Sequence, residues 1–280
     1  MGVEGAVNRQ LRQLGLELFR ADPGTLGYGR TQTRSMRNTV LGALASRGYG
    51  VRRTYDRDVP AAMIAIAERA RPYTMTSPRS VIGLCEAIEY VVRNQIPGAV
   101  VECGVWRGGS MIAAALSLQQ ATAGDRDLYL FDTFAGMPMP DRDDVSLTDP
   151  DEQPLARWQS DQRDGRNTWA YAPLDEVRAN VLSTGYPSER VHLIKGRIEE
   201  TIPGNAPESI ALLRLDTDWY SSTRHELEHL YPRLARRGVL IVDDYGAWAG
   251  ARKAVQEYPP ARKLFLARVD GPVRIAIKPS

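Results

Sequence analysis

Largely apolar runs that stop abruptly at aspartates dominate the second half of the chain. Two such runs, Leu212–Leu215 and Gly238–Val242, are each followed by acidic residues. Runs of this length that end at turn or cap residues are typical of buried parallel strands. The leucine spacing of Ser221–Arg236 predicts a crossover helix between them, so this region is expected to form a βαβ unit.

Apolar runs of the same kind predict the rest of a sheet. We expect earlier strands at Ala99–Glu102, Leu128–Phe131 and Val191–Ile194, and a terminal hairpin of Leu264–Val269 with Val273–Ile277. Helical patterns lie between or before the strands, at Ala61–Ala70, Pro78–Asn94, Met111–Gln120 and Leu174–Leu182. Five strands that alternate with helices, followed by a hairpin, predict an α/β sandwich with a mostly parallel, seven-stranded sheet.

The N-terminal part of the chain departs from this alternation. Spaced apolar residues predict an amphipathic helix within about the first 20 residues: Leu11, Leu14, Leu16 and Phe19. Glycines and arginines interrupt any pattern in Asp22–Arg53. We therefore expect a mainly helical N-terminal segment over residues 1–75 and an α/β domain over residues 76–280.

A long polar interruption lies inside the α/β domain, at residues 136–173, and is called the lid segment below. Loops of this length within a compact domain are usually functional or disordered. Trp158, Trp169 and Tyr171 favour an ordered lid, because a disordered segment rarely contains so many large aromatic side chains.

Composition narrows the range of partners. The net charge is +2 and the arginines are scattered, so we expect neither a nucleic acid nor a membrane surface as a partner. Cys85 and Cys103 lie within apolar patterns, which suits buried thiols in a reducing compartment. No apolar run is long enough to span a bilayer, and the N-terminus lacks a signal-peptide pattern. The expected location is the cytoplasm.

Four aspartates are expected to meet at the carboxyl end of the sheet: Asp216, Asp218, Asp243 and Asp244. Open α/β sheets bind their ligands at this edge. Like charges in one crevice repel one another unless a cation lies among them, and hard dications such as Mg²⁺ prefer oxygen ligands. Each aspartate alone is better explained as a cap at a strand-to-helix turn. The convergence of all four favours a metal site.

The turn that follows the first predicted strand, Glu102–Ser110, is rich in glycine. Glycines let a ligand approach the backbone, and a helix N-terminus offers free N–H groups to an anion. The spacing differs from G-x-G-x-x-G, and Glu102 would repel a pyrophosphate. S-adenosylmethionine has both a carboxylate and an ammonium group and suits this turn, with Asp132 placed to accept the ribose hydroxyls. The competing interpretation is a tight turn, with Asp132 as a helix cap.

The order of five segments resembles the macrocin O-methyltransferase family: Pro72–Ser77, Val101–Ser110, Phe131–Pro138, Leu213–Tyr220 and Val242–Tyr245. Five blocks in sequence are more specific than any single motif. The resemblance implies a Rossmann-like class I methyltransferase fold for residues 76–280. It also implies an enzyme that depends on S-adenosylmethionine and Mg²⁺. Its expected reaction is methylation of a deoxysugar hydroxyl, on a bacterial natural product or its nucleotide-sugar precursor.

The resemblance further implies roles for individual residues. Asp216, Asp243 and Asp244 are expected to bind the metal, and Asp218 is expected to be the general base. Cofactor contacts are expected from Thr76, Glu102, Gly104, Ser110, Asp132, Thr133, Gly196, Arg197, Ile198 and Asp216. From their flat apolar surfaces we expect acceptor contacts by Trp158, Trp169, Tyr171 and Tyr220. The acceptor is expected to be a small sugar or glycosylated molecule, and the enzyme a homo-oligomer.

Several alternatives stay open. His225-Glu226-Leu227-Glu228-His229 matches the H-E-x-x-H pattern of zinc proteases. Against this, Leu227, Leu230 and Leu234 should face the sheet, which leaves the histidines on a solvated helix face. A nicotinamide-dependent oxidoreductase and a binding module without chemistry are both disfavoured by the complete set of aspartates. Among methyltransferases, a catechol or phenol acceptor competes with a sugar, because paired oxygens on a metal suit both.

Overall fold

The computed structural model describes residues 16–20 and 49–280, and the chain divides into two compact units, Met1–Pro60 and Ala61–Ser280. In the first unit, β1 (Leu16–Arg20) pairs antiparallel with β2 (Tyr49–Arg53). The helix predicted within the first 20 residues is therefore wrong at Leu16–Arg20, where a strand pairing overrides the local helical spacing. Residues 1–15, which include most of that prediction, lie outside the described residues.

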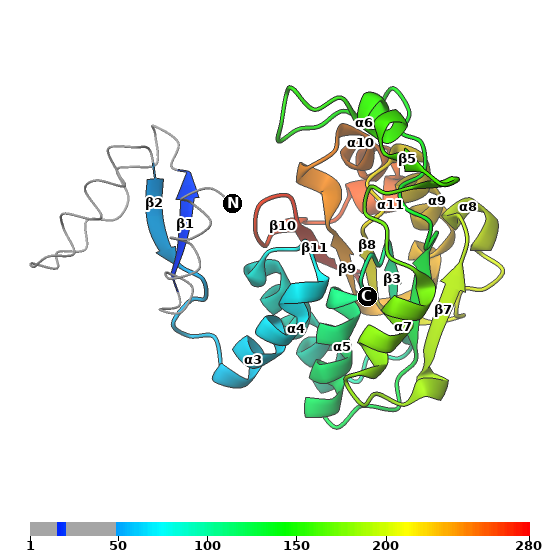
Figure 1. Cartoon of the computed structure of the whole chain (residues 1–280). Coiled ribbons are helices and arrows are strands. Elements are labelled where there is room, and N and C mark those ends of the chain that lie inside the picture. The colour runs from blue at the N-terminus through cyan, green and yellow to red at the C-terminus, as the bar shows by residue number, and fades with distance from the viewer. Residues whose placement is uncertain (1–15, 21–48) are drawn as a thin grey trace, which may run out of the picture. The chain divides into compact units, whose positions relative to one another are not determined.

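The second unit is built around a seven-stranded sheet in the order β10-β11-β9-β8-β3-β4-β7 (Figure 1). Its strands are β3 (Ala99–Cys103), β4 (Leu128–Asp132), β7 (Val191–Lys195), β8 (Ile210–Leu215), β9 (Leu234–Val242), β10 (Ala267–Arg268) and β11 (Arg274–Ile277). The pairs among β7, β4, β3, β8 and β9 are parallel, whereas β11 is antiparallel to β9 and to β10. The predicted mostly parallel sheet with a terminal antiparallel hairpin is confirmed.

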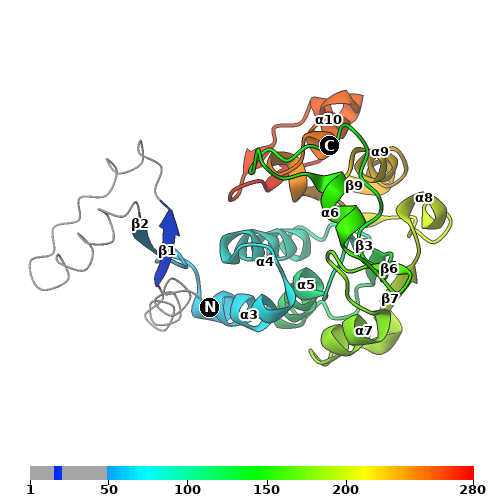
Figure 2. The same ribbon diagram turned by 45° about the horizontal axis from the view of Figure 1, so that its top comes forward.

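Helices cover both faces of this sheet (Figure 2). One group contains α3 (Ala61–Ala70), α4 (Pro78–Arg93), α5 (Gly109–Gln120) and α7 (Leu174–Leu182). The other contains α8 (Ile198–Thr201), α9 (Tyr220–His229), α10 (Ala249–Glu257) and α11 (Pro259–Arg262). Short 3₁₀ turns lie at Arg71–Tyr73, Ser188–Arg190, Tyr231–Arg233 and Asp244–Gly246. None of the helices in residues 49–280 has the length and hydropathy needed to cross a bilayer.

Local chemistry explains where these helices begin and end. Ser77 caps α4 by accepting a hydrogen bond from the Ser80 N–H, and Pro78 occupies the first turn, as the sequence predicts. The predicted helix Ser221–Arg236 is wrong at its C-terminal end, because α9 stops at His229. Pro232 has no N–H to continue a helix, and the chain enters β9 already at Leu234.

The middle of the sheet forms the core. Every residue of β3 and β8 is buried, as expected for parallel strands that are covered on both faces. The chain leaves β3 toward β4 on one side and later returns to β8 on the other. Ligands of doubly wound folds bind at such a switch point, outside the carboxyl ends of the strands. The fold therefore directs attention to the residues that follow β3, β4, β8 and β9.

The lid segment contains α6 (Pro154–Ser160) and a small hairpin of β5 (Gln162–Arg163) and β6 (Arg166–Asn167). Its two ends are joined to each other, since the Met137 N–H donates to the Trp169 carbonyl at 3.0 Å. The aromatic residues thus belong to a segment with secondary structure of its own. That the segment covers a bound acceptor stays a prediction.

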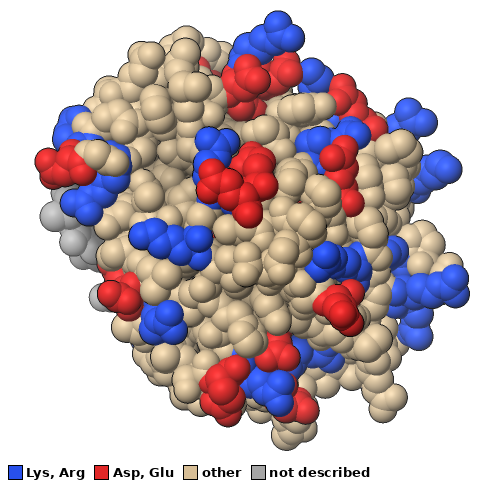
Figure 3. Space-filling model, turned by 90° about the vertical axis from the view of Figure 1, so that its right-hand side faces the viewer, with Lys and Arg blue, Asp and Glu red and all other residues tan. Residues whose placement is uncertain are grey.

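Basic and acidic side chains are interspersed on the face of the molecule in Figure 3, without a broad patch of one sign. The two cysteines, Cys85 and Cys103, are free and buried, as their apolar surroundings predict. Exposed ion pairs such as Arg93–Glu89 individually add little to stability.

Candidate active site

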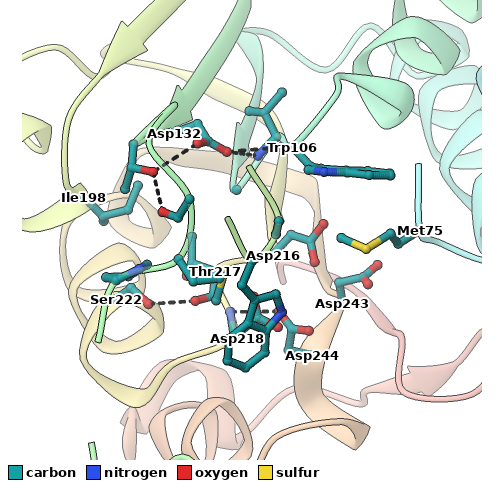
Figure 4. A pocket seen from close by; sticks show the side chains of 18 of the residues that line it. Met75, Trp106, Asp132, Ile198, Asp216, Thr217, Asp218, Ser222, Asp243 and Asp244 are labelled. Carbon is teal, nitrogen blue, oxygen red and sulfur yellow. Dashed lines mark hydrogen bonds between the residues drawn. The ribbon is translucent and has the colours of Figure 1, made fainter. Parts of the chain in front are cut away.

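A cavity of about 380 Å³ lies at the carboxyl ends of the central strands (Figure 4). Much of its lining comes from the segments that follow four strands: Gly104–Trp106 after β3, Asp132 and Thr133 at β4, Asp216–Asp218 after β8, and Asp243 and Asp244 after β9. Figure 4 shows Asp132 at one end of the cavity and the other acids together at the opposite end. The sheet brings these segments together from widely separated positions in the chain.

Three carboxylates form a cluster with the geometry of a cation site. One oxygen from each of Asp216, Asp243 and Asp244 can be chosen so that all lie within 4.8 Å of one another. Burial raises the pKa of all three carboxyls, that of Asp243 to about 7, so ionising them together at neutral pH requires a positive partner. Three hard oxygen ligands fit Mg²⁺, which usually completes its shell with water and substrate oxygens.

Arg214, inside β8, lies beneath this cluster and was not singled out by the sequence analysis. Its guanidinium donates to four oxygens: Glu102 Oε1, Asp216 Oδ2 and Asp243 Oδ1, each at 2.5 Å, and Thr76 Oγ1 at 2.8 Å. The side chain is only 3% exposed, so these pairs are little screened by water. The protein therefore supplies one positive charge of its own to the acids. An arginine in an otherwise apolar buried strand was the available signal.

Glu102 lies deeper than its predicted contact with the cofactor requires. It is 1% exposed and is not among the residues that line the cavity. One carboxylate oxygen accepts from Arg214, whereas Oε2 is buried without a hydrogen-bond partner. Burial raises the pKa of Glu102 to about 8, and the Arg214 charge opposes that shift. A direct bond from Glu102 to the cofactor stays a prediction.

Asp132 organises the glycine turn as well as facing the cavity. Its Oδ2 accepts from the Val105 N–H at 2.7 Å and the Trp106 N–H at 3.1 Å, and its Oδ1 accepts from the Phe134 N–H at 2.7 Å. The turn itself requires Gly104, whose φ is +81° and whose added Cβ would lie 1.8 Å from the Asp216 carbonyl oxygen. Asp132 does not cap a helix, because the N–H groups bonded to it lie in turns, and its contact with the ribose hydroxyls stays a prediction.

No side chain caps α5, whose N-cap is Gly108 with φ +87°. An uncapped helix start at a cavity is the arrangement in which backbone N–H groups can serve an anionic ligand group. Ser110, in the first turn of α5, lines the cavity. Binding of the S-adenosylmethionine carboxylate at this helix start stays a prediction.

Asp218 lies beside the acid cluster but in an unexpected backbone conformation. Its φ is +66°, in the left-handed region that non-glycine residues seldom adopt. The Asp218 N–H donates to Asp244 Oδ2 at 3.0 Å, and its Oδ1 accepts from the Trp248 indole N–H at 2.6 Å. Burial raises the pKa of Asp218 to about 7, while the bond from Trp248 opposes the shift.

The competing role of Asp218 as a helix cap is not what the structure has. The N-cap residue of α9 is Trp219, and its side chain makes no capping hydrogen bond. The Tyr220 N–H at the start of α9 donates to Asp144 Oδ1 at 2.7 Å instead. The carboxylate of Asp218 is thus directed to the cavity rather than to the following helix.

Comparison with known proteins agrees with this geometry. The family model described as macrocin O-methyltransferase (TylF) matches residues 31–271. The chain belongs to this family. Over 186 residues it is 34% identical to 8-demethyl-8-(2,3-dimethoxy-alpha-L-rhamnosyl)-tetracenomycin-C 4'-O-methyltransferase of Streptomyces olivaceus, a match that covers 66% of this chain and 67% of that protein. It is also 33% identical, over 186 residues, to mycinamicin III 3''-O-methyltransferase of Micromonospora griseorubida, a match that covers 66% of this chain and 70% of that protein.

Solved structures agree on the fold. The O-methyltransferase NovP superposes with a TM-score of 0.65 at 27% identity, over 78% of this chain and 88% of that one. The calicheamicin methyltransferase CalS11 gives a TM-score of 0.54 at 18% identity, over 90% and 98%, which is a likeness of fold alone. The protein is therefore an S-adenosylmethionine-dependent O-methyltransferase with a class I methyltransferase fold.

The remaining predicted cofactor residues of this methyltransferase divide into two groups. Thr76, Thr133, Arg197 and Ile198 line the cavity. Gly196 is not among the lining residues, and its φ of +146° serves the turn after β7. Met75, Trp106 and Arg157 also line the cavity, although the sequence analysis assigned them no role.

The four aromatic residues predicted to contact the acceptor are separated by the structure. Trp169 lines the cavity. Trp158 donates its indole N–H to the Met137 carbonyl at 2.8 Å, and the Tyr220 hydroxyl donates to Glu257 at 2.7 Å; neither lines the cavity, nor does Tyr171. Trp248 does line it and was missed, because nothing in the local sequence distinguishes it from a core tryptophan.

The H-E-x-x-H motif does not form a metal site among the described residues. Glu226 is fully buried and accepts from the Thr217 hydroxyl at 2.9 Å, while His225 Nε2 lies 2.9 Å from the Ile202 carbonyl oxygen. Within residues 49–280, the side chains close enough together to hold a metal ion are those of Asp216, Asp243 and Asp244. The motif helix instead packs Leu227 and Leu230 into the core, as expected.

Proposed function

We propose that this O-methyltransferase is Mg²⁺-dependent and methylates a sugar hydroxyl of a bacterial natural product or of its nucleotide-sugar precursor. The observation on which the proposal rests is the three-aspartate cluster beside Asp218, with carboxylate oxygens of the three within 4.8 Å. The name of one relative describes transfer to the 4' position of a rhamnosyl-tetracenomycin, and that of another describes transfer to the 3'' position of mycinamicin III, which supports a sugar acceptor.

In this proposal Asp216, Asp243 and Asp244 hold the dication, and the turn at Gly104, Ser110, Asp132 and Thr133 holds the cofactor. When bound, the cofactor supplies the methyl group and the dication lowers the pKa of the acceptor hydroxyl. Arg214 keeps Asp216 and Asp243 in fixed positions through its hydrogen bonds. The cavity presents these groups on rigid strand ends, which favours an in-line approach of the two substrates.

Asp218 takes the proton in this proposal. Burial raises the pKa of its carboxyl, which makes the carboxylate a better base than that of a solvent-exposed aspartate. The carboxylate then holds the proton at an oxygen while the methyl group moves to the acceptor. Trp169, from the lid segment, forms an apolar part of the cavity wall and excludes water from that side.

The proposal is tested by methyl transfer from labelled S-adenosylmethionine to a panel of glycosylated antibiotics, nucleotide sugars and catechols. We expect label on a sugar hydroxyl, loss of transfer in EDTA and recovery with Mg²⁺. Transfer to catechols in preference to sugars would contradict the proposed sugar acceptor. Transfer unaffected by EDTA would contradict the proposed metal dependence.

A further inference from the structure

Building on the proposed role of Asp218, we propose that Trp248 is a positioning residue whose indole N–H orients the Asp218 carboxylate, and that the lid segment holds Trp248 in place. The bond from Trp248 Nε1 to Asp218 Oδ1 measures 2.6 Å and joins residues 30 positions apart in the chain. It occupies one carboxylate oxygen and leaves the other for an acceptor hydroxyl. A base held in one orientation loses less entropy when the reaction begins.

The lid segment is hydrogen-bonded to the backbone on both sides of Trp248. The Leu147 N–H donates to the Ala247 carbonyl at 2.7 Å, and the Ala249 N–H donates to the Val145 carbonyl at 2.8 Å. Ser146 and Trp248 form the antiparallel bridge between these two bonds. The backbone position of Trp248 therefore depends on the beginning of the lid segment.

A cluster of three tryptophans, Trp169, Trp219 and Trp248, fixes the indole ring itself. The ring centroids of Trp219 and Trp248 are 5.0 Å apart with planes at 72°, and those of Trp169 and Trp219 are 5.5 Å apart at 75°. Trp169 also contacts Trp248 at 6.1 Å. Edge-to-face packing of this kind restricts ring rotation. Since Trp169 belongs to the lid segment, the lid contributes to the orientation of Trp248.

Asp144 connects the same part of the lid to the helix that follows Asp218. It is 2% exposed, and its Oδ1 accepts from the Tyr220 N–H at the start of α9. It also lies so close to α10 that a Cβ on Gly250 would be 2.0 Å from Oδ1. The lid thus contacts the first turns of α9 and α10, which flank Asp218 and Trp248. Displacement of the lid would disturb both residues at once.

The test removes the indole N–H alone. Trp248→Phe keeps an aromatic ring but loses the donor, and we expect kcat to fall by about 10- to 100-fold with little change in S-adenosylmethionine affinity. Replacement of Trp248 by β-(3-benzothienyl)alanine, which puts sulfur in place of N–H in a ring of the same shape, should give the same loss. This second variant keeps the test valid if Trp248→Phe folds poorly.

A double-mutant cycle separates positioning from a general structural effect. In an Asp218→Asn background, Trp248→Phe should lower kcat no further, because its effect acts through Asp218. Tyr186→Phe is the matched control: it removes a buried aromatic donor, here bonded to the Arg126 carbonyl at 2.6 Å, at a residue outside the lid segment and the cavity lining. Any loss caused by Tyr186→Phe should multiply with that of Asp218→Asn.

The outcomes distinguish this inference from the function on which it rests. An unchanged kcat with benzothienylalanine at position 248, or a Trp248→Phe loss that multiplies fully with Asp218→Asn, would overturn the positioning role and leave the proposed reaction intact. If Asp218→Asn alone retains kcat within about threefold of wild type, the general-base assignment fails, and the positioning role fails with it.

Discussion

Arg214 on β8 donates through Nη2 to Oδ1 of Asp243, the residue that follows the neighbouring strand β9, at 2.5 Å. The same guanidinium binds Asp216, so two of the three candidate metal ligands share one buried cation. An acid cluster with its own arginine can fold without a metal, because the uncompensated charge is smaller. The metal site and the stability of the sheet are therefore linked through one side chain.

Arg214→Met should destabilise the protein by about 3–5 kcal/mol, since it leaves buried carboxylates without their partner. Arg214→Lys is the matched variant, because it keeps the charge but cannot reproduce the forked bonds to Glu102, Asp216 and Asp243. Its free energy of unfolding should lie between those of wild type and Arg214→Met. Urea unfolding followed by circular dichroism measures both. A loss below about 1 kcal/mol for Arg214→Met would show that the guanidinium contributes little.

Gly104→Ala should abolish tight cofactor binding, because the new Cβ would lie 1.8 Å from the Asp216 carbonyl oxygen and displace the turn. Gly165→Ala is the control, with a similar φ of +76° but nothing within 4 Å of the added Cβ. It bears only the backbone strain, about 1 kcal/mol. Calorimetry with S-adenosylmethionine should show at least a tenfold (about 1.4 kcal/mol) loss for Gly104→Ala and no change for Gly165→Ala. If Gly104→Ala bound S-adenosylmethionine as tightly as wild type, the cofactor would not bind at this turn.

Metal-free protein should become less stable as the pH rises from about 4 to about 8. The pKa values of Glu102, Asp218 and Asp243 are raised from 4.5, 3.8 and 3.8 to about 8, 7 and 7 in the folded state, chiefly by burial. Between these values the unfolded chain has lost protons that the folded protein still binds, so unfolding becomes more favourable with increasing pH. Mg²⁺ should restore more stability at pH 8 than at pH 5, measured by thermal unfolding in EDTA and in Mg²⁺. A Tm that rises with pH in EDTA would contradict this.

The two thiols should react slowly in the folded protein. Burial raises the pKa of Cys85 to about 11, and it raises that of Cys103 as well. Because the thiolate is the reactive form, an aromatic disulfide reagent at pH 8 should modify neither residue until the protein unfolds. Two equivalents should react rapidly after addition of urea. Rapid modification of the native protein would mean that the helices over Cys85 open readily.

Sequence patterns predict the sheet well because its strands are buried on both faces and stop at polar residues. The convergence of Asp216, Asp243 and Asp244 follows from the same rule, since parallel strands end at one edge. The end of α9 was missed because the leucine spacing continues through Pro232, although proline cannot continue the helix. The strand at Leu16–Arg20 depends on pairing with residues 49–53, which local spacing does not reveal.

Contacts between side chains distant in sequence account for most of what the sequence analysis missed at the site. Whether Arg214 faces solvent, core or acids depends on the neighbouring strands. The role of Trp248 depends on a hydrogen bond of 2.6 Å to Asp218, which lies 30 residues away in the chain. It also depends on a left-handed backbone conformation at Asp218, which non-glycine residues seldom adopt. No periodicity of apolar residues encodes either feature.

The decisive measurement for the proposed metal site is calorimetric titration of Mg²⁺ into the protein saturated with S-adenosylmethionine. Wild type should bind Mg²⁺ at one site, and the variant Asp243→Asn with Asp244→Asn should show no binding, because two of the three clustered carboxylates are lost. The control His225→Ala with His229→Ala, in the H-E-x-x-H motif, should bind like wild type. Mg²⁺ binding that survives in the aspartate variant, or is lost in the histidine variant, would contradict a site made by Asp216, Asp243 and Asp244.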